Sequence, residues 1–311
     1  MFIIEYMMCL KQAESEVNQM KPIGVVTDSH SCISPEKAAE LGIKVLPMPF
    51  YIEDECYFEN VSISRDEFFE KLKSGADIAT SQPSPSSIFE IWDEALKEFE
   101  QIVYIPISSG LSGSCATATA FAEEEDYKGK VYVVDNGRVS TPLYRSVLDA
   151  LELIEEGYSA KEIKDILEAS KADMVIYVAV EDLSYLKRGG RINAASAALA
   201  TALNIKPVLK FDIGDLDAYK KCRGIKNARK TMIEAMKNEF STRFKDYYDK
   251  GEINLVAASS TSPEVTEDWI NEIKEAFPGM EVLHAPLSFG LACHIGPGGL
   301  GIGCSCRPKR I

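Results

Sequence analysis

The sequence lacks the features that identify several classes of protein. No apolar run approaches the roughly 20 residues that a membrane span needs, and the longest candidate, residues 1–10, contains Glu5 and lacks the basic start of a signal peptide. None of the eight cysteines has the C-x-x-C spacing of zinc or redox sites, and there are only three histidines. We therefore expect a cytoplasmic chain with reduced cysteines, no metal, no cofactor and no integral membrane segment.

Positive charge is also scarce. The chain has 34 basic and 48 acidic residues, which gives a net charge of −14. This charge repels phosphate backbones and anionic membrane surfaces, so no nucleic-acid partner is expected. The hydrophobic fraction of 46% and the charged fraction of 26% are typical of a globular chain, and 311 residues predict about two domains.

Short apolar runs rich in β-formers alternate with amphipathic helical stretches, the pattern of an α/β fold. Three Ser-Pro pairs, at 34–35, 84–85 and 262–263, place serine at the N-cap and proline at the first helical position. The strands are predicted at residues 23–26, 43–51, 102–107, 131–134, 175–180, 205–211, 216–222, 255–259, 282–283 and 299–303. The helices are predicted near residues 35–41, 64–73, 86–99, 113–125, 140–156, 160–170, 192–203, 224–240 and 263–277.

The order of these elements predicts two domains after an N-terminal extension, residues 1–20. Residues 21–172 alternate strand and helix, which indicates a parallel, Rossmann-like sheet. A hairpin predicted around residues 213–215, with Gly-Asp as turn chemistry, breaks this alternation. We therefore expect residues 173–311 to form a second α/β domain with a mixed sheet.

Hydroxyl side chains collect where predicted elements of the first half end, in residues 27–31, 80–84 and 108–114. The carboxyl ends of parallel strands meet at one crevice, so these loops are expected to converge. Fresh helix N-termini at Ser84 and near Ser112 would favour an anion such as a carboxylate or phosphate. For Ser34 and Ser84 helix capping is the simpler interpretation, whereas Ser112 lies between glycines that let a ligand approach the backbone.

Two other functions stay open at this point. Ser112 and His294, with Asp28 or Asp135, could form the catalytic set of a serine hydrolase or acyltransferase, although Gly110-Leu111-Ser112-Gly113 lacks the last residue of a nucleophile elbow. The second open function is that of a regulator that binds a small phosphorylated ligand in the same crevice. The G-x-G-x-x-G at residues 296–301 has too little chain after it for a dinucleotide site.

Residues 187–191 hold three cations and two glycines in an otherwise acidic protein. Arg188 and Arg191 could clamp a carboxylate or acyl phosphate, or face an acidic partner. The end of a helix would explain Lys187 equally well, but it explains Arg191 less well.

Five motifs in order resemble the DegV family over roughly residues 21–304. They are TDS at 27–29, TSQP at 80–83, SSGLSG at 108–113, LKRGGRI at 186–192 and HIGPG at 294–298. The resemblance implies a two-domain α/β protein that holds a long-chain fatty acid in a tunnel between its domains. It also implies a non-enzymatic subunit that presents the fatty acid to a separate ATP-dependent fatty acid kinase subunit, with an acyl-phosphate acyltransferase as a further candidate partner.

The resemblance also assigns roles to residues of this chain. Thr80 and Ser112 look like the hydroxyls that bind the fatty acid carboxylate, and His294 belongs to the same network. Ser81 and Ser29 lie in matching motifs. Arg188 and Arg191 look like the basic pair near the head group that engages the kinase. The chain departs from the family pattern at Cys32, at Ser114-Cys115 and at Asn136.

The chemistry of these residues agrees with a carrier. Neutral hydroxyls and one histidine hold an anion well but lack the paired carboxylates of general acid–base catalysis. An acyl chain gains about 0.8 kcal/mol for each buried methylene, so the tail is expected to dominate the affinity. The nearly uncharged residues 194–203 are predicted either as a tunnel wall or as a buried core helix.

Overall fold

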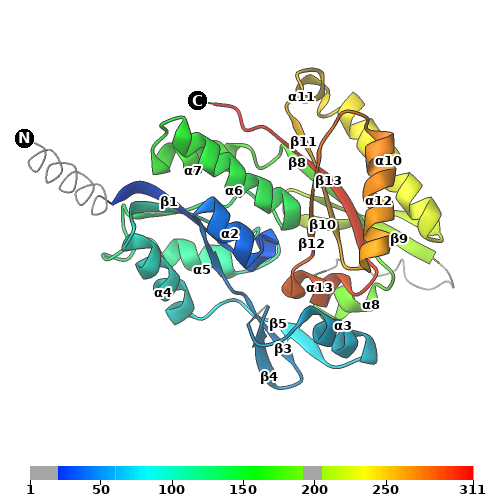
Figure 1. Cartoon of the computed structure of the whole chain (residues 1–311), viewed down its shortest axis with the longest axis horizontal. Helices are drawn as coiled ribbons and strands as arrows, with labels where there is room; N and C mark the ends of the chain where they lie inside the picture. Colours follow the sequence, from blue (N-terminus) through cyan, green and yellow to red (C-terminus); the bar gives the residue numbers. More distant parts are fainter. Residues whose placement is uncertain (1–19, 60, 192–204, 311) are drawn as a thin grey trace, which may run out of the picture.

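The computed structural model describes residues 20–59, 61–191 and 205–310 of the chain. Two large sheets lie side by side, with a small sheet below them both in the view of Figure 1. Helix α6 (Ser140–Glu155) packs against strands of both large sheets. The predicted boundary at residues 172/173 falls between α7 (Ala160–Ala169) and β8 (Met174–Ala179), and the division itself stays a prediction.

The first sheet is entirely parallel, with the strand order β2-β1-β6-β7. Val25 and Val26 of β1 are buried in different clusters on opposite faces, as expected for a parallel sheet that is covered on both sides. The parallel first sheet confirms the predicted α/β class. Its strands are β1 (Lys21–Asp28), β2 (Lys44–Leu46), β6 (Phe99–Ile105) and β7 (Val131–Val133), and its other helices are α2 (Pro35–Leu41), α4 (Pro85–Leu96) and α5 (Ser114–Phe121).

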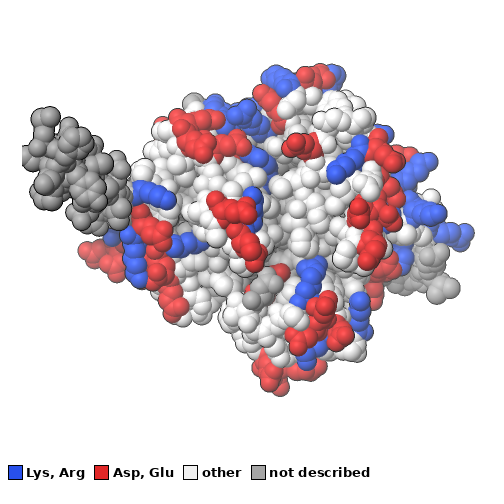
Figure 2. All heavy atoms as spheres, viewed as in Figure 1, with Lys and Arg blue, Asp and Glu red and all other residues white. Residues whose placement is uncertain are grey.

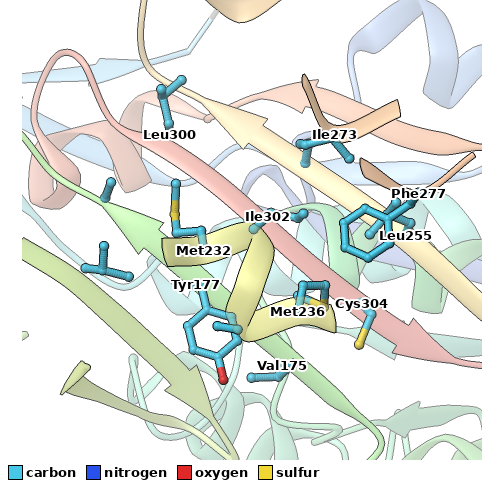
Figure 3. Packing of buried hydrophobic residues seen from close by; sticks show 14 of the residues in the cluster. Val175, Tyr177, Met232, Met236, Leu255, Ile273, Phe277, Leu300, Ile302 and Cys304 are labelled. Atoms are coloured by element: carbon cyan, nitrogen blue, oxygen red, sulfur yellow. The ribbon is translucent and has the colours of Figure 1, made fainter. Parts of the chain in front are cut away.

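The second sheet is mixed, as predicted, with the order β10-β9-β8-β13-β11-β12 and only the last pair parallel. Figure 3 shows Met232 and Met236 of helix α10 packed over this sheet beside Tyr177, Ile302 and Cys304. The remaining strands are β9 (Ile205–Asp212), β10 (Asp215–Arg223), β11 (Ile253–Ser259), β12 (Val282–Pro286) and β13 (Leu300–Cys306), and the helices are α10 (Ile225–Ser241), α11 (Lys245–Asp249) and α12 (Pro263–Ala276).

The two faces of strand β13 differ, because one carries large apolar side chains and the other carries glycines. Leu300, Ile302 and Cys304 point into the core beneath α10 and α12. Because side chains alternate along a strand, Gly301 and Gly303 present their bare backbone to the other face. This second face of the sheet is turned toward the first sheet and leaves space there.

The sequence prediction was wrong about the strand at residues 43–51. The chain forms two strands there, β2 in the parallel sheet and β3 (Pro49–Ile52) in a third sheet with the order β4-β3-β5. Pro47 lies between β2 and β3 and has no N–H to continue a ladder. The unpredicted partners, β4 (Glu55–Phe58) and β5 (Ile78–Thr80), are too short to show a clear alternation.

Helix α3 (Arg65–Ser74) was predicted. Three short helices were not predicted, namely α8 (Ser184–Arg188), α11 and α13 (Phe289–Ile295). Helix α13 lies between the small sheet and the second large sheet (Figure 1). The rings of Phe68 and Phe289 stack with centroids 4.4 Å apart, which fixes α13 against α3. The helix predicted at residues 192–203 lies outside the described residues.

Local signals were read correctly at several element ends. The side chains of Ser34, Ser84 and Ser262 each accept a backbone N–H in the first turn of their helices, as expected for N-caps. The hairpin between β9 and β10 is present, but its two turn residues are Ile213 and Gly214 rather than Gly-Asp. Both turn residues have positive φ angles, of 51° and 93°, as a type I′ turn requires.

Candidate ligand-binding cavity

A cavity lies between the two large sheets. Its empty space, including the part open to solvent, is about 1050 Å³. The second sheet supplies one wall through Ile176, Val178, Phe211 and the backbone of residues 301–303, and the first half supplies Ile107, Leu111 and Val139. The lining is therefore mainly apolar and comes from both halves of the chain.

A small polar cluster, which we call the head-group cluster, lies in this lining and consists of Thr80, Ser112 and His294. Thr80 ends strand β5, and His294 lies in the last turn of α13. Thr80 Oγ1 and His294 Nε2 are 2.9 Å apart, a hydrogen bond between residues separated by more than two hundred positions in the sequence. The loop between β6 and α5 brings Ser112 to the same cavity.

The electrostatic environment keeps His294 neutral. Burial, together with the smaller effects of nearby Arg191 and His30, lowers the pKa of His294 to about 4. Its Nδ1 atom is buried and has no hydrogen-bond partner among the described residues. Gly189 makes this position possible, since a Cβ atom there would be only 2.0 Å from Nδ1.

Ser112 has a hydroxyl proton available for a ligand. Its Oγ accepts the N–H of Ser114 at 3.2 Å, in the first turn of α5, whose N-cap Gly113 has no side chain to do so. No acceptor for the Ser112 hydroxyl proton exists in the described part of the chain. Ser81 and Gln82 also line the cavity, but Ser81 Oγ donates to the Gln82 carbonyl at 3.0 Å.

The remaining residues of the predicted site have different positions. Arg191 lines the cavity and donates from Nε to the Leu111 carbonyl at 3.3 Å, which links the two halves at the cavity edge. Arg188 is exposed, lies outside the lining and stacks on Tyr185 with its guanidinium carbon 4.8 Å from the ring centroid. Ser29 also lies outside the lining, and its Oγ accepts the N–H of Met48 at 3.1 Å.

The structure does not form the catalytic set considered for a hydrolase. His294 is bonded to Thr80 rather than Ser112, and no carboxylate orients its Nδ1 atom. Asp28 is fully buried and accepts the backbone N–H groups of His30 and Ile107. Asp135 is bonded to Ser109 and Lys171.

Sequence reasoning missed four polar residues of the lining: His30, Gln82, Ser140 and Thr141. His30 belongs to a hydroxyl-rich loop that the sequence analysis did single out, so its place after β1 was a usable signal. Ser140 and Thr141 begin α6 without any motif to mark them. In the described ranges, no group of three His, Cys, Asp or Glu side chains could hold a metal ion.

Figure 2 shows acidic and basic side chains interspersed over the face in view, without a broad basic patch. Among the described residues, no helix has the length and apolar character needed to cross a bilayer.

Fold and cavity together define a class: an α/β protein whose two large sheets enclose an apolar ligand-binding cavity with a small polar cluster. A family model described as "Uncharacterised protein, DegV family" matches residues 22–306. The chain therefore belongs to the DegV family, and the resemblance inferred from the five motifs is confirmed.

Individual relatives cover nearly the whole chain. A DegV domain-containing protein of Halalkalibacterium halodurans is 31% identical over 288 residues, which are 91% of this chain and 98% of the relative. A structure of a DegV family protein from Thermus thermophilus, described by its fatty acid binding, is 32% identical with a TM-score of 0.80 and covers 92% of this chain and 99% of its own. DegV of Bacillus subtilis, described as a fatty acid binding protein, is 27% identical with a TM-score of 0.77, at 92% and 99% coverage.

Proposed function

We propose that this protein binds one long-chain fatty acid in the cavity and presents its carboxylate to a separate, ATP-dependent kinase subunit that forms an acyl phosphate. The observation that carries the proposal is an apolar cavity whose lining includes the neutral hydrogen-bonding side chains of the head-group cluster. Related DegV proteins that bind fatty acids support the same ligand class.

The head-group cluster suits a carboxylate. If the neutral His294 ring carries its proton on Nε2, it donates to Thr80 Oγ1 and leaves the Thr80 hydroxyl proton free. The Ser112 hydroxyl proton is free as well. Two hydroxyl donors thus reach one carboxylate, and an ionised acceptor makes such hydrogen bonds shorter and stronger.

The apolar lining suits an acyl tail. Side chains such as Ile176, Val178 and Phe211 offer no hydrogen bonds, so a small phosphorylated ligand would leave most of the cavity unused. Burial of a dozen methylenes contributes on the order of 10 kcal/mol before the losses of association. The tail therefore supplies most of the affinity, and the hydroxyls orient the head group.

The proposed site has no machinery for turnover of its own. A carboxylate between hydroxyls and a neutral imidazole is held in place but is not activated, because the head-group cluster contains no carboxylate pair for general acid–base catalysis. Arg188 is exposed beside the cavity edge formed by Arg191, where a partner that carries ATP could approach. We propose Arg188 and Arg191 as contacts of the kinase subunit.

The first experiment is mass spectrometry of organic extracts from protein purified without added lipid. We expect about one fatty acid per chain in the wild type, and at least a tenfold loss in a Thr80→Ala, Ser112→Ala variant because both carboxylate donors are gone. Ser109→Ala is the matched control, since Ser109 lies in the same loop but bonds to Asp135. An empty wild type that also fails to bind added palmitate would refute the proposal.

The kinase partnership needs its own measurement. With ATP, palmitate and a purified fatty acid kinase subunit, acyl phosphate should form only when this protein is present, and hydroxylamine trapping measures it. Arg188→Ala should keep the bound fatty acid but slow acyl-phosphate formation at least tenfold. Equal rates with and without this protein would rule out the carrier role. Labelling of Ser112 by an acyl-phosphonate probe would support the hydrolase instead.

A further inference from the structure

The cavity contains a second set of polar side chains that the head-group cluster does not use. His30, Ser140 and Thr141 all line it, and they are 7%, 6% and 2% exposed. The same lining also includes the apolar side chains of Val139, Leu287 and Leu291. Polar groups this deeply buried normally have hydrogen-bond partners, so their presence in a ligand cavity requires a reason.

His30 is held by the end of strand β1. Its Nδ1 atom is 3.4 Å from Oδ1 of Asp28, a carboxylate that is itself fixed by the backbone N–H groups of His30 and Ile107. This approach is not a hydrogen bond, but in the tautomer that carries its proton on Nδ1, beside the carboxylate, the ring has a lone pair on Nε2. Nε2 lies against Gly290 of α13, where a Cβ atom would be 2.7 Å away, and it has no hydrogen-bond partner in the described chain.

Ser140 and Thr141 open helix α6 on the opposite side of this space. Their helix has no side-chain cap, because its N-cap residue is Val139. Ser140 has a φ of 57°, a left-handed conformation that is unfavourable for serine, and its Oγ is 3.6 Å from Cys32 Sγ. Thr141 Oγ1 makes no hydrogen bond within the described residues, so its hydroxyl is available to a ligand.

One residue of each polar set lies at helix α13. His30 contacts this helix at Gly290, and His294 follows four residues later. Four residues of helix rise by about 6 Å. A carboxylate and a second polar atom, each with a hydrogen bond of about 2.8 Å to its own set, can cover such a separation when they are a few bonds apart.

We propose that His30, Ser140 and Thr141 form a hydroxyl subsite, which selects fatty acids with a hydroxyl group on the carbon β to the carboxylate. A hydroxyl would donate to Nε2 of His30 and accept from Thr141, whereas a methylene would leave both unsatisfied. This inference rests on the proposed function, because it presumes that the carboxylate occupies the head-group cluster.

The test compares the binding of β-hydroxypalmitate, palmitate and ω-hydroxypalmitate to delipidated protein by calorimetry. The wild type should bind β-hydroxypalmitate about tenfold more tightly than either of the others, the factor typical of one satisfied buried polar group. His30→Leu, which keeps the volume but not the acceptor, should reduce this ratio to about one while palmitate still binds. His284→Leu is the matched control, because His284 in β12 bonds to Ser259 and lies outside the lining.

The outcomes separate the two proposals. Equal affinity of the wild type for the three acids, or a preference that survives in His30→Leu, would refute the hydroxyl subsite while the carrier role stands. Failure of all three acids to bind would refute the carrier role as well. If His30→Leu does not fold, Thr141→Val removes a hydroxyl at nearly constant shape and should reduce the β-hydroxyl preference several-fold, and an unchanged preference in that variant would also refute the subsite.

Discussion

The two ring nitrogens of His294 differ in their surroundings, because only one of them has a hydrogen-bond partner. Nε2 is bonded to Thr80, whereas Nδ1 faces the backbone of Gly189 without a partner. The position of the ring therefore depends on the absence of a side chain at residue 189. The contacts of His294 therefore connect α8, α13 and the small sheet.

Gly189→Ala tests this dependence. The added methyl group would lie 2.0 Å from Nδ1, so the ring must move away from Thr80, and we expect fatty acid affinity to fall at least tenfold in a palmitate displacement assay. Gly113→Ala is the control, because both glycines have helical φ angles, −72° and −67°, and a Cβ atom at residue 113 meets only Gln82 at 3.6 Å. Similar affinities in the two variants would contradict the proposed role of His294.

The low pKa of His294 makes a prediction about stability. Above pH 6.5 the ring is neutral in the folded and unfolded states and contributes nothing. Between 6.5 and about 4 only the unfolded state takes up the proton, so stability decreases as the pH falls, by up to about 3 kcal/mol. Urea unfolding across this range should show a smaller decrease in His294→Gln than in the wild type, and parallel curves would contradict it.

At the residue scale, the sequence identified Thr80, Ser112 and His294 because they lie in motifs, and the structure brings all three to one cavity. Ser29, which the sequence placed only in a matching motif, accepts a backbone N–H instead. The difference is a matter of side-chain direction, which depends on long-range packing.

Helix α13 is the element on which the cavity most depends. Its first N–H, that of Phe289, is accepted by Glu59 Oε2 at 2.9 Å, and burial raises the pKa of Glu59 to about 7. The helix carries both His294 and Gly290, the contact of His30. Its seven residues lack charges and an amphipathic pattern, so only its packing against the small sheet reveals it as a helix.

Strand β13 gives a prediction at the scale of the element. Gly301 faces the cavity, and a Cβ atom there would meet nothing closer than 3.6 Å, so Gly301→Leu should fold and place its side chain in the space for the tail. We expect palmitate to bind at least tenfold more weakly, while laurate, which has a shorter tail, loses less. Both affinities are measured by calorimetry.

Ile302→Val is the matched control for Gly301→Leu. Ile302 is the next residue and points into the core on the other face, so this change should cost about 1 kcal/mol of stability but leave palmitate affinity unchanged. Equal losses for palmitate and laurate in Gly301→Leu would place the acyl tail elsewhere.

Long helices and strands were predicted correctly from the sequence, whereas several short ones were missed. Long periodic helices such as α6 and α10 and the strands of the second sheet were predicted, because an alternating or helical pattern needs several residues to appear. Strands β4 and β5, with four and three residues, have no such pattern. Gly301 of β13 is the last glycine of the G-x-G-x-x-G at residues 296–301, which the sequence analysis rejected as a dinucleotide site, and it lines the cavity.

At the scale of the whole molecule, the cavity is an interface between two halves of the chain. Arg191 reaches across it to Leu111, and a Cβ atom on Gly110 would be 2.3 Å from the Gly214 carbonyl oxygen, so the β9–β10 hairpin contacts the loop that carries Ser112. A ligand that fills this interface contacts both halves. Its removal should therefore weaken the entire molecule.

Extraction of the lipid tests this expectation. A ligand at one hundred times its Kd stabilises the folded state by about 2.7 kcal/mol, so delipidated protein should melt several degrees lower in scanning calorimetry. Added palmitate should restore the melting temperature, whereas methyl palmitate, which has no carboxylate, should restore less. An unchanged melting temperature after complete extraction would show that no ligand bridges the halves.

The sequence alone determined the α/β class, a parallel first sheet followed by a mixed sheet, and the DegV family, and its motifs drew attention to Thr80, Ser112 and His294. These properties depend on local periodicity, capping and short motifs, which are encoded in neighbouring residues. The tertiary structure decided which polar side chains share the cavity, since Thr80 meets His294 across more than two hundred residues and His30 meets Gly290 across an even longer stretch of sequence. Such long-range contacts follow from the packing of α13 between the sheets, and no local sequence pattern predicts them.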